Sequence, residues 1–400
     1  MNEFRSLKPA LRLQIIVISL VRITFNIMYR MVYPYLGEFS RGMGVGLPEL
    51  SRAFTLRSIA GGIAPLLAFF ADSYGRKAGM LVGLVLITLG TGALVIWPTF
   101  SVFVLAMVVT TAGYHIFVPS MQAYLGDNVP YQQRGLAMAV TEFGWSLSFI
   151  AGVPLVGLLI RRYGWSSPYP VFAALSLVGM LVLARLLPGK PPSAAPNQGV
   201  AANLRIVLAT PAAWAGLAMS ALMTSANESV NLVFGLWMDQ AFGLKITSLG
   251  LVAVGIGTAE LAAEFLVSGL VDRLGKARAI ALGLVGNGLA ALGFLWVGSS
   301  RLGAVVVLLL FFLCFEFAIV SGLPLMTEIV PAARATFMAA NFSMFALGRA
   351  AGAALGGWLY TLSLPHLPQI GANVLFAAGL NLLALAALAL LAKSAKIEHD

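Results

Sequence analysis

The feature that most constrains this chain is its succession of apolar segments, each about twenty residues long, separated by short charged clusters. A helix of about 20 residues crosses the hydrocarbon core of a bilayer. Hydrophobic residues fill 60% of the 400 positions and charged residues only 10%, against roughly 25% in soluble proteins. We therefore expect an all-α membrane protein. The net charge of +10 is attributed to cationic cytoplasmic loops, and no nucleic-acid binding is expected.

Twelve transmembrane helices are predicted, and one long polar interval divides them into two groups of six. The interval, residues 189–204, reads GKPPSAAPNQGVAANL and is typical of a flexible linker. The predicted domains are therefore residues 1–188 and 205–400, each a six-helix bundle. The predicted spans are 12–36, 48–71, 78–97, 100–125, 135–160, 169–188, 210–240, 246–271, 278–297, 302–326, 335–360 and 370–392.

The two halves share a small charged turn. ADSYGRK, at 71–77, lies between the second and third spans, and VDRLGKAR, at 271–278, lies between the eighth and ninth. Their aspartates and glycines are 200 positions apart. A second related pair, DNVPYQQRG at 127–135 and EIVPAARA at 328–335, follows the fourth and tenth spans. The halves are therefore interpreted as parallel repeats, a building plan of transporters.

Two six-span halves joined by such turns resemble the major facilitator superfamily. Its signature turn has a small residue, three residues, Asp, two residues, Gly, then Arg or Lys. The matching positions here are Ala68, Asp72, Gly75, Arg76 and Lys77, and in the second half Ser268, Asp272, Gly275, Lys276 and Arg278. The resemblance implies alternating-access transport and an inner gate, whose expected residues are Asp72, Gly75, Arg76, Asp127, Asp272, Gly275 and Lys276. The alternative is that the cations only direct membrane topology.

The fifth span carries a motif that resembles the kinked helix of proton-coupled antiporters in this superfamily. Gly152 and Pro154 match the pattern, whereas Val153 replaces the glycine expected before the proline. The arginine that the antiporters tend to place four residues before a fourth-helix glycine is also missing, because Val109 precedes Gly113 at that spacing. The resemblance is nearest to the drug/metabolite:proton antiporter branch.

Charged residues inside spans are costly and therefore informative. The third, sixth, ninth and twelfth spans have none in their interiors, so we expect these helices to face lipid. The first and seventh spans carry polar clusters at helical spacing. The candidate substrate-binding residues are Arg22, Asn26, Tyr29, Arg30, Tyr33, His115, Asn227, Asn231 and Arg349. Two roles stay open for the arginines: binding an anionic substrate, or forming salt bridges with carboxylates of the opposite half.

Carboxylates within the spans are candidates for proton coupling, because arginine does not release its proton. The candidates are Glu228, Glu316, Glu260 and Glu264. Glu142 is close to the expected inner surface, and we expect it to be solvated. His115 is either part of a proton relay or a hydrogen-bonded structural residue.

These patterns favour a secondary active transporter that exports a small organic solute in exchange for protons. The alternatives are proton-coupled uptake or exchange of an organic anion and, more remotely, a receptor or scaffold without transport. The sequence has no metal-ligand cluster, P-loop or nucleotide-binding domain, so no enzyme activity, metal or cofactor is expected. We expect a monomer in a bacterial inner membrane. Most lysines and arginines fall on the inside if both termini are cytoplasmic.

Overall fold

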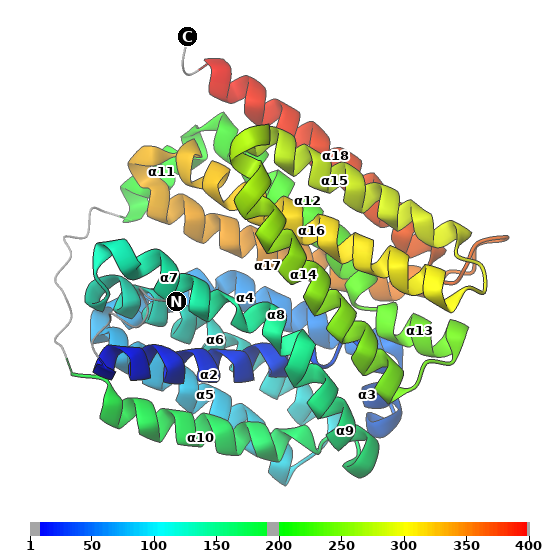
Figure 1. Ribbon diagram of the computed structural model, residues 1–400, viewed down its shortest axis with the longest axis horizontal. Coiled ribbons are helices and arrows are strands. Elements are labelled where there is room, and N and C mark those ends of the chain that lie inside the picture. Colours follow the sequence, from blue (N-terminus) through cyan, green and yellow to red (C-terminus); the bar gives the residue numbers. More distant parts are fainter. Residues whose placement is uncertain (1–8, 190–199, 398–400) are drawn as a thin grey trace. The chain divides into compact units, whose positions relative to one another are not determined.

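The computed structural model describes the backbone of residues 9–189 and 200–397. Side chains at 64–74, at five positions from 131 to 139, at 200–201 and at 395–397 lie outside this description. The described part of the chain forms helices and contains no strand (Figure 1). A helix satisfies its own backbone hydrogen bonds, which an apolar chain in lipid cannot obtain from water. The predicted all-α class is confirmed.

The helices of the first half follow the predicted spans one to six. They are α2 (Pro9–Arg30), α3 (Leu36–Met43), α4 (Leu47–Tyr74), α5 (Arg76–Ile96), α6 (Phe100–Asn128), α7 (Tyr131–Glu142), α8 (Gly144–Leu147), the π-helical turn η1 (Ser148–Gly152), α9 (Val153–Tyr163) and α10 (Pro168–Leu186). The fifth span is thus assembled from α7, α8, η1 and α9.

The helices of the second half follow spans seven to twelve. They are α11 (Val200–Ala209), α12 (Pro211–Asn231), α13 (Phe234–Phe242), α14 (Ile246–Leu274), α15 (Lys276–Gly293), η2 (Phe294–Trp296), α16 (Arg301–Ile329), η3 (Pro331–Ala333), α17 (Arg334–Tyr360) and α18 (Gly371–Ile397). α11 begins inside the interval 189–204, so the end of the expected linker is helical.

Membrane-crossing length is common among the helices. Within the described residues, nine helices are long and apolar enough to span a bilayer, and the count is ten if the pair 202–209 and 211–242, bent by 83°, forms one span. α4 and α17 have 28 and 27 residues, which is long enough to cross a bilayer, but they are more polar. The chain is an integral membrane protein.

The chain forms two compact units. One comprises residues 1–45 and 63–195, and the other comprises 46–62 and 196–400. The first part of α4 therefore belongs with the second-half helices, although the sequence repeat groups it with the first half. The domain limits 1–188 and 205–400 follow the repeat and stay a prediction.

Equivalent helices pack alike within the two units. A Cβ atom built on Gly83 of α5 would lie 2.6 Å from the carbonyl oxygen of Gly113 on α6. One built on Gly283 of α15, 200 positions later, would lie 2.8 Å from the backbone nitrogen of Ala318 on α16. Small residues let membrane helices approach to backbone contact. The internal repeat is therefore a repeat of packing as well as of sequence.

Spans three, six, nine and twelve carry neutral polar links instead of charges. The Thr88 hydroxyl of α5 donates to Ser176 Oγ of α10 at 3.1 Å. In the second unit Asn381 Nδ2 of α18 donates to Asn287 Oδ1 of α15 at 2.8 Å. These bonds tie each pair of helices together without placing an ion in the membrane.

A ladder of glycines joins α17 to α12. Gly348, Gly352 and Gly356 recur every four residues, so they form one stripe along α17. A Cβ on Gly352 would lie 2.5 Å from the Ser225 carbonyl oxygen, and one on Gly356 would lie 2.8 Å from the Cα of Ser229. This close contact holds α12, which carries the polar cluster of the seventh span, against α17.

Candidate functional site

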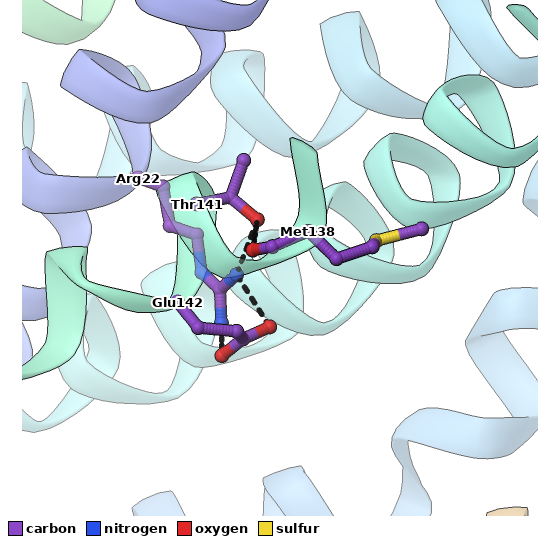
Figure 2. Close-up of polar contacts among 4 residues, drawn as sticks. All are labelled: Arg22, Met138, Thr141 and Glu142. Atoms are coloured by element: carbon purple, nitrogen blue, oxygen red, sulfur yellow. Dashed lines mark hydrogen bonds and ion pairs between the residues drawn. The ribbon is translucent and has the colours of Figure 1, made fainter. Parts of the chain in front are cut away.

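Arg22 and Glu142 form the central polar contact of the first unit. Arg22 Nη1 donates to Glu142 Oε1 at 2.8 Å, and Nη2 donates to Oε2 at 2.6 Å. Nη1 also donates to Thr141 Oγ1 at 3.1 Å, and the Thr141 hydroxyl in turn donates to the Met138 carbonyl. Figure 2 shows the α2 guanidinium lying between these two side chains of α7. A two-pronged Arg–carboxylate contact is a strong and orienting interaction.

This pairing differs from the expected one. We expected Arg22 to meet a carboxylate of the opposite half or a substrate anion, and Glu142 to be merely solvated. Instead, Arg22 pairs with Glu142 of the fifth span, in the same half. The Glu142 side chain is 50% exposed. The packing of α2 against α7 brings together residues that are 120 positions apart, and no local sequence pattern predicts such a pair.

Asn26, one helical turn beyond Arg22, is completely buried. Among the described residues, neither of its side-chain polar atoms has a hydrogen-bond partner, and the same is true of Arg22 Nε. A Cβ atom built on Gly144 would lie 3.5 Å from Asn26 Nδ2, so the amide lies beside the glycine of the fifth span. Buried polar groups nearly always have partners, so these unpaired atoms are candidates for contact with a polar ligand or water.

Arg30, two turns beyond Arg22, is buried among rings of the fifth span. Its guanidinium carbon lies 3.5 Å from the centre of the Phe149 ring and 4.3 Å from that of Trp145. Nη1 donates to the Trp145 carbonyl at 2.9 Å. Aromatic faces attract a cation most strongly where water is absent. The aromatic partners of Arg30 were not predicted from the sequence.

Tyrosines extend this polar and aromatic region. The Tyr29 ring stacks on that of Tyr114 of α6 and lies 6.4 Å from the Trp145 ring. His115 contacts Tyr114 edge to face. Tyr33 is buried at the C-terminal end of the first span. The candidates of the first and fourth spans therefore lie in one unit, around the fifth span.

The second unit holds a buried ion pair of its own. Glu228 of α12 is fully buried, and its Oε2 lies 3.5 Å from Nη1 of Arg349, whose side chain is 18% exposed. Asn231 Nδ2 donates to the same oxygen at 3.4 Å. Here too the pair was predicted only as separate residues, because α12 and α17 are far apart in the sequence.

The remaining candidates of the second unit differ in burial. Asn227 is buried, and its Nδ2 lacks a hydrogen-bond partner in the described structure. Glu260 of α14 is buried. Glu264 of α14 and Glu316 of α16 are partly exposed.

The repeated turns form one ion pair in each unit. Arg76 Nε lies 3.4 Å from Asp127 Oδ2, and Lys276 Nζ donates to Glu328. Glu328 was not among the predicted gate residues, although it follows Asp127 by 201 positions and the repeat offset would have identified it. The Asp72 side chain lies outside the described residues, and Asp272 is exposed.

Glycine is required at both turns. Gly75 and Gly275 have φ angles of 90° and 83°, in the region that residues with a Cβ avoid. They end α4 and α14 and start α5 and α15. The glycines therefore determine the direction in which α5 and α15 begin, and with it the positions of Arg76 and Lys276.

The chain has membrane-length helices in two units. The units share their packing, and each contains ion pairs. This combination is typical of a polytopic transporter. The chain belongs to the Major Facilitator Superfamily, whose sequence profile matches residues 18–318 and 217–399. Members of this family and the matched relatives are transporters rather than enzymes. Recognition of the family from the paired turns is confirmed, and so is membrane transport of a small molecule as the general function.

Several curated relatives are similar to this chain. The uncharacterized MFS-type transporter YwfA of Bacillus subtilis is 32% identical over 138 residues, which span 32% of this chain and about a third (34%) of YwfA. Multidrug resistance protein 2 of the same bacterium is 22% identical over 88% of this chain and 90% of that protein. The solved bacterial homolog of the human lysosomal transporter Spinster has a TM-score of 0.75 at 14% identity, covering 98% and 96% of the two chains. At that identity the likeness concerns the fold alone.

Proposed function

We propose that this protein is a secondary active transporter that exports small organic solutes in exchange for protons by alternating access. The observation that carries the proposal is the fully buried Glu228, held by Arg349 and Asn231. A carboxylate inside a membrane protein is costly and marks ion pathways. The similarity to Multidrug resistance protein 2 supports an organic solute.

The coupling mechanism follows from the chemistry of this cluster. When Glu228 takes a proton, its attraction to Arg349 is lost, because the carboxylate becomes neutral. When the proton leaves, the pair forms again. Each half-cycle therefore changes the contacts between α12 and α17, two helices that the glycine ladder already holds together. Glu260, Glu264 and Glu316 are further candidate proton carriers.

Transport by purified protein in liposomes tests this proposal. With an acidic interior, wild-type protein should accumulate the cationic dye ethidium, and a protonophore should abolish the accumulation. Glu228→Gln should lose accumulation but retain exchange of ethidium at equal pH. Glu49→Gln, which changes a partly exposed carboxylate in the first turn of α4, is the matched control. If Glu228→Gln accumulates as much ethidium as wild type, another carboxylate carries the proton. If wild-type protein accumulates no ethidium, the export of such solutes is contradicted.

Proton-coupled uptake or exchange of an organic anion is the second candidate. The observation that favours it is the placement of Arg22 and Arg30 on one face of the first span, both buried. Uptake of radiolabelled benzoate into liposomes with an acidic exterior tests this candidate. Accumulation of benzoate but not of ethidium would favour anion uptake, and the reverse would favour export.

We also propose that the protein works as a monomer in a bacterial inner membrane with both termini in the cytoplasm. The lysine and arginine distribution supports this orientation, and the bacterial relatives support the location. Reporter fusions at each terminus test the orientation, and light scattering in detergent tests the monomer.

A further inference from the structure

We propose that Arg22 is a binding site for a carboxylate ligand, preferably an aromatic one, and that Glu142 is an internal substitute which the ligand displaces. This inference rests on the proposed transport function for its purpose, but it concerns binding alone. The ligand carboxylate would occupy the guanidinium that Glu142 holds in the structure (Figure 2).

The two partners of the pair differ in their freedom to move. The Arg22 side chain is 6% exposed, whereas that of Glu142 is 50% exposed. Glu142 ends α7 next to a break in the fifth span before α8. The carboxylate therefore has room to turn away from Arg22, while the guanidinium stays buried and needs another anion.

Glu142 also leaves part of the polar site unused. It contacts only Nη1 and Nη2 of Arg22, so Nε lacks a hydrogen-bond partner, as does the Asn26 amide one turn away. Both groups are buried and both offer N–H donors. A carboxylate with two oxygens matches donors of this kind.

Aromatic rings next to the arginines give the preferred class of ligand. Tyr29, Tyr114 and Trp145 form a continuous set of ring contacts. The Trp145 ring centre lies 4.3 Å from the guanidinium carbon of Arg30. An aryl group attached to the carboxylate would add to these rings by stacking or edge contacts.

Displacement, rather than simple addition, follows from charge. Two carboxylates on one guanidinium would repel each other in a site with little water. Binding of an anionic ligand therefore requires Glu142 to leave. Removing the charge of Glu142 should then help the ligand, which is the opposite of what a purely structural ion pair predicts.

Binding of benzoate to the purified protein in detergent tests this proposal, measured by calorimetry and by the melting temperature. Benzamide, which is neutral and of nearly the same shape, is the control ligand. Benzoate but not benzamide should bind wild-type protein. Glu142→Gln should bind benzoate about tenfold more tightly, the factor expected if Glu142 occupies Arg22 nine-tenths of the time. Glu49→Gln should bind like wild type.

Two further variants locate the site. Arg22→Lys should lose most benzoate binding, because a point charge does not replace the guanidinium fork, and Asn26→Ala should weaken it several-fold. Unchanged or weaker benzoate binding by Glu142→Gln would overturn the proposal. If this variant is unstable, its recovery during purification in benzoate but not in benzamide supports the proposal, and recovery in neither overturns it. Because no gradient is present, these outcomes are independent of proton-coupled export.

Discussion

At the scale of residues, the two units use opposite arrangements of charge. In the first unit the arginine is on the first span and the glutamate on the fifth. In the second unit the glutamate is on the seventh span, and the arginine is on the eleventh. The equivalent helix pairs are thus each linked by an ion pair with the signs exchanged, although the paired residues do not follow the repeat offset of 200 positions. The two pairs differ in the exposure of their carboxylates, and that difference determines the cost of breaking them.

Removing the arginine of the buried pair should be the more damaging change. Arg349→Ala leaves Glu228 charged without its ion-pair partner in the protein interior, which costs roughly 3 kcal/mol or more. Arg22→Ala leaves Glu142 half-exposed, so we expect a smaller loss. Melting temperatures of both variants in the same detergent measure the difference. Arg41→Ala, which breaks a more exposed pair with Glu38, is the control, and an equal loss in all three variants would contradict the argument.

A double variant separates the charge from the packing. Glu228→Gln combined with Arg349→Gln removes both charges and keeps similar volumes. It should be more stable than Arg349→Ala, because no charge is left buried alone. A double variant that is no more stable than Arg349→Ala would show that the side-chain contacts matter more than the charges.

At the scale of elements, small residues determine which helices touch. The glycine ladder of α17 lets its backbone approach α12, and Asn373 of α18 donates to the carbonyl oxygens of Ser229 and Gly356 at 2.8 Å. Three helices are therefore joined at one level.

The fifth span, with its π-helical turn followed by Pro154, is irregular where α17 is continuous. Such turns often occur at functional sites.

Adding one methyl group to the ladder should destabilise the protein. Gly352→Ala would place a Cβ 2.5 Å from the Ser225 carbonyl oxygen, and the two helices would have to separate, at a cost of about 1–3 kcal/mol. Gly379→Ala on α18, where a Cβ meets nothing within 4 Å, should be neutral or slightly stabilising, because alanine favours helices. Thermal unfolding of both variants in detergent checks this contrast, and equal melting temperatures would contradict the packing argument.

At the scale of the whole molecule, the repeated turns are the candidates for a gate. Arg76–Asp127 and Lys276–Glu328 are exposed pairs at equivalent positions. Exposed ion pairs contribute little to stability, typically below about 1 kcal/mol. We therefore propose that their repetition at two equivalent helix ends serves the control of conformation rather than stability.

Neutralising one of these pairs should change the conformational equilibrium without unfolding the protein. If Asp72, Arg76 and Asp127 form the expected latch, Asp127→Asn should shift the protein toward an inward-open state at an unchanged melting temperature. Glu328→Gln tests the equivalent pair, and Glu49→Gln is the control. Distances between spin labels on the inner ends of the two halves measure the shift. An unchanged distance distribution would leave the cations as determinants of topology alone.

The sequence alone determined the class of protein, the positions of its spans and its internal repeat. These features are local, because about twenty apolar residues in a row form a membrane helix whatever their neighbours are. The turns with Gly75 and Gly275 are local too, since their positive φ angles need no distant partner. The candidate residues of the first and seventh spans were identified because a charge inside an apolar run is conspicuous.

Only the tertiary structure decided which charges meet. Arg22 could have faced the opposite half, a substrate or its own half, and the packing of α2 on α7 selected Glu142. The packing of the fifth span likewise placed the Trp145 and Phe149 rings against Arg30. A side chain's partner depends on the register and rotation of helices that are distant in the sequence. The close contacts of glycines and other small residues set that register, and a hydrophobic pattern does not specify it.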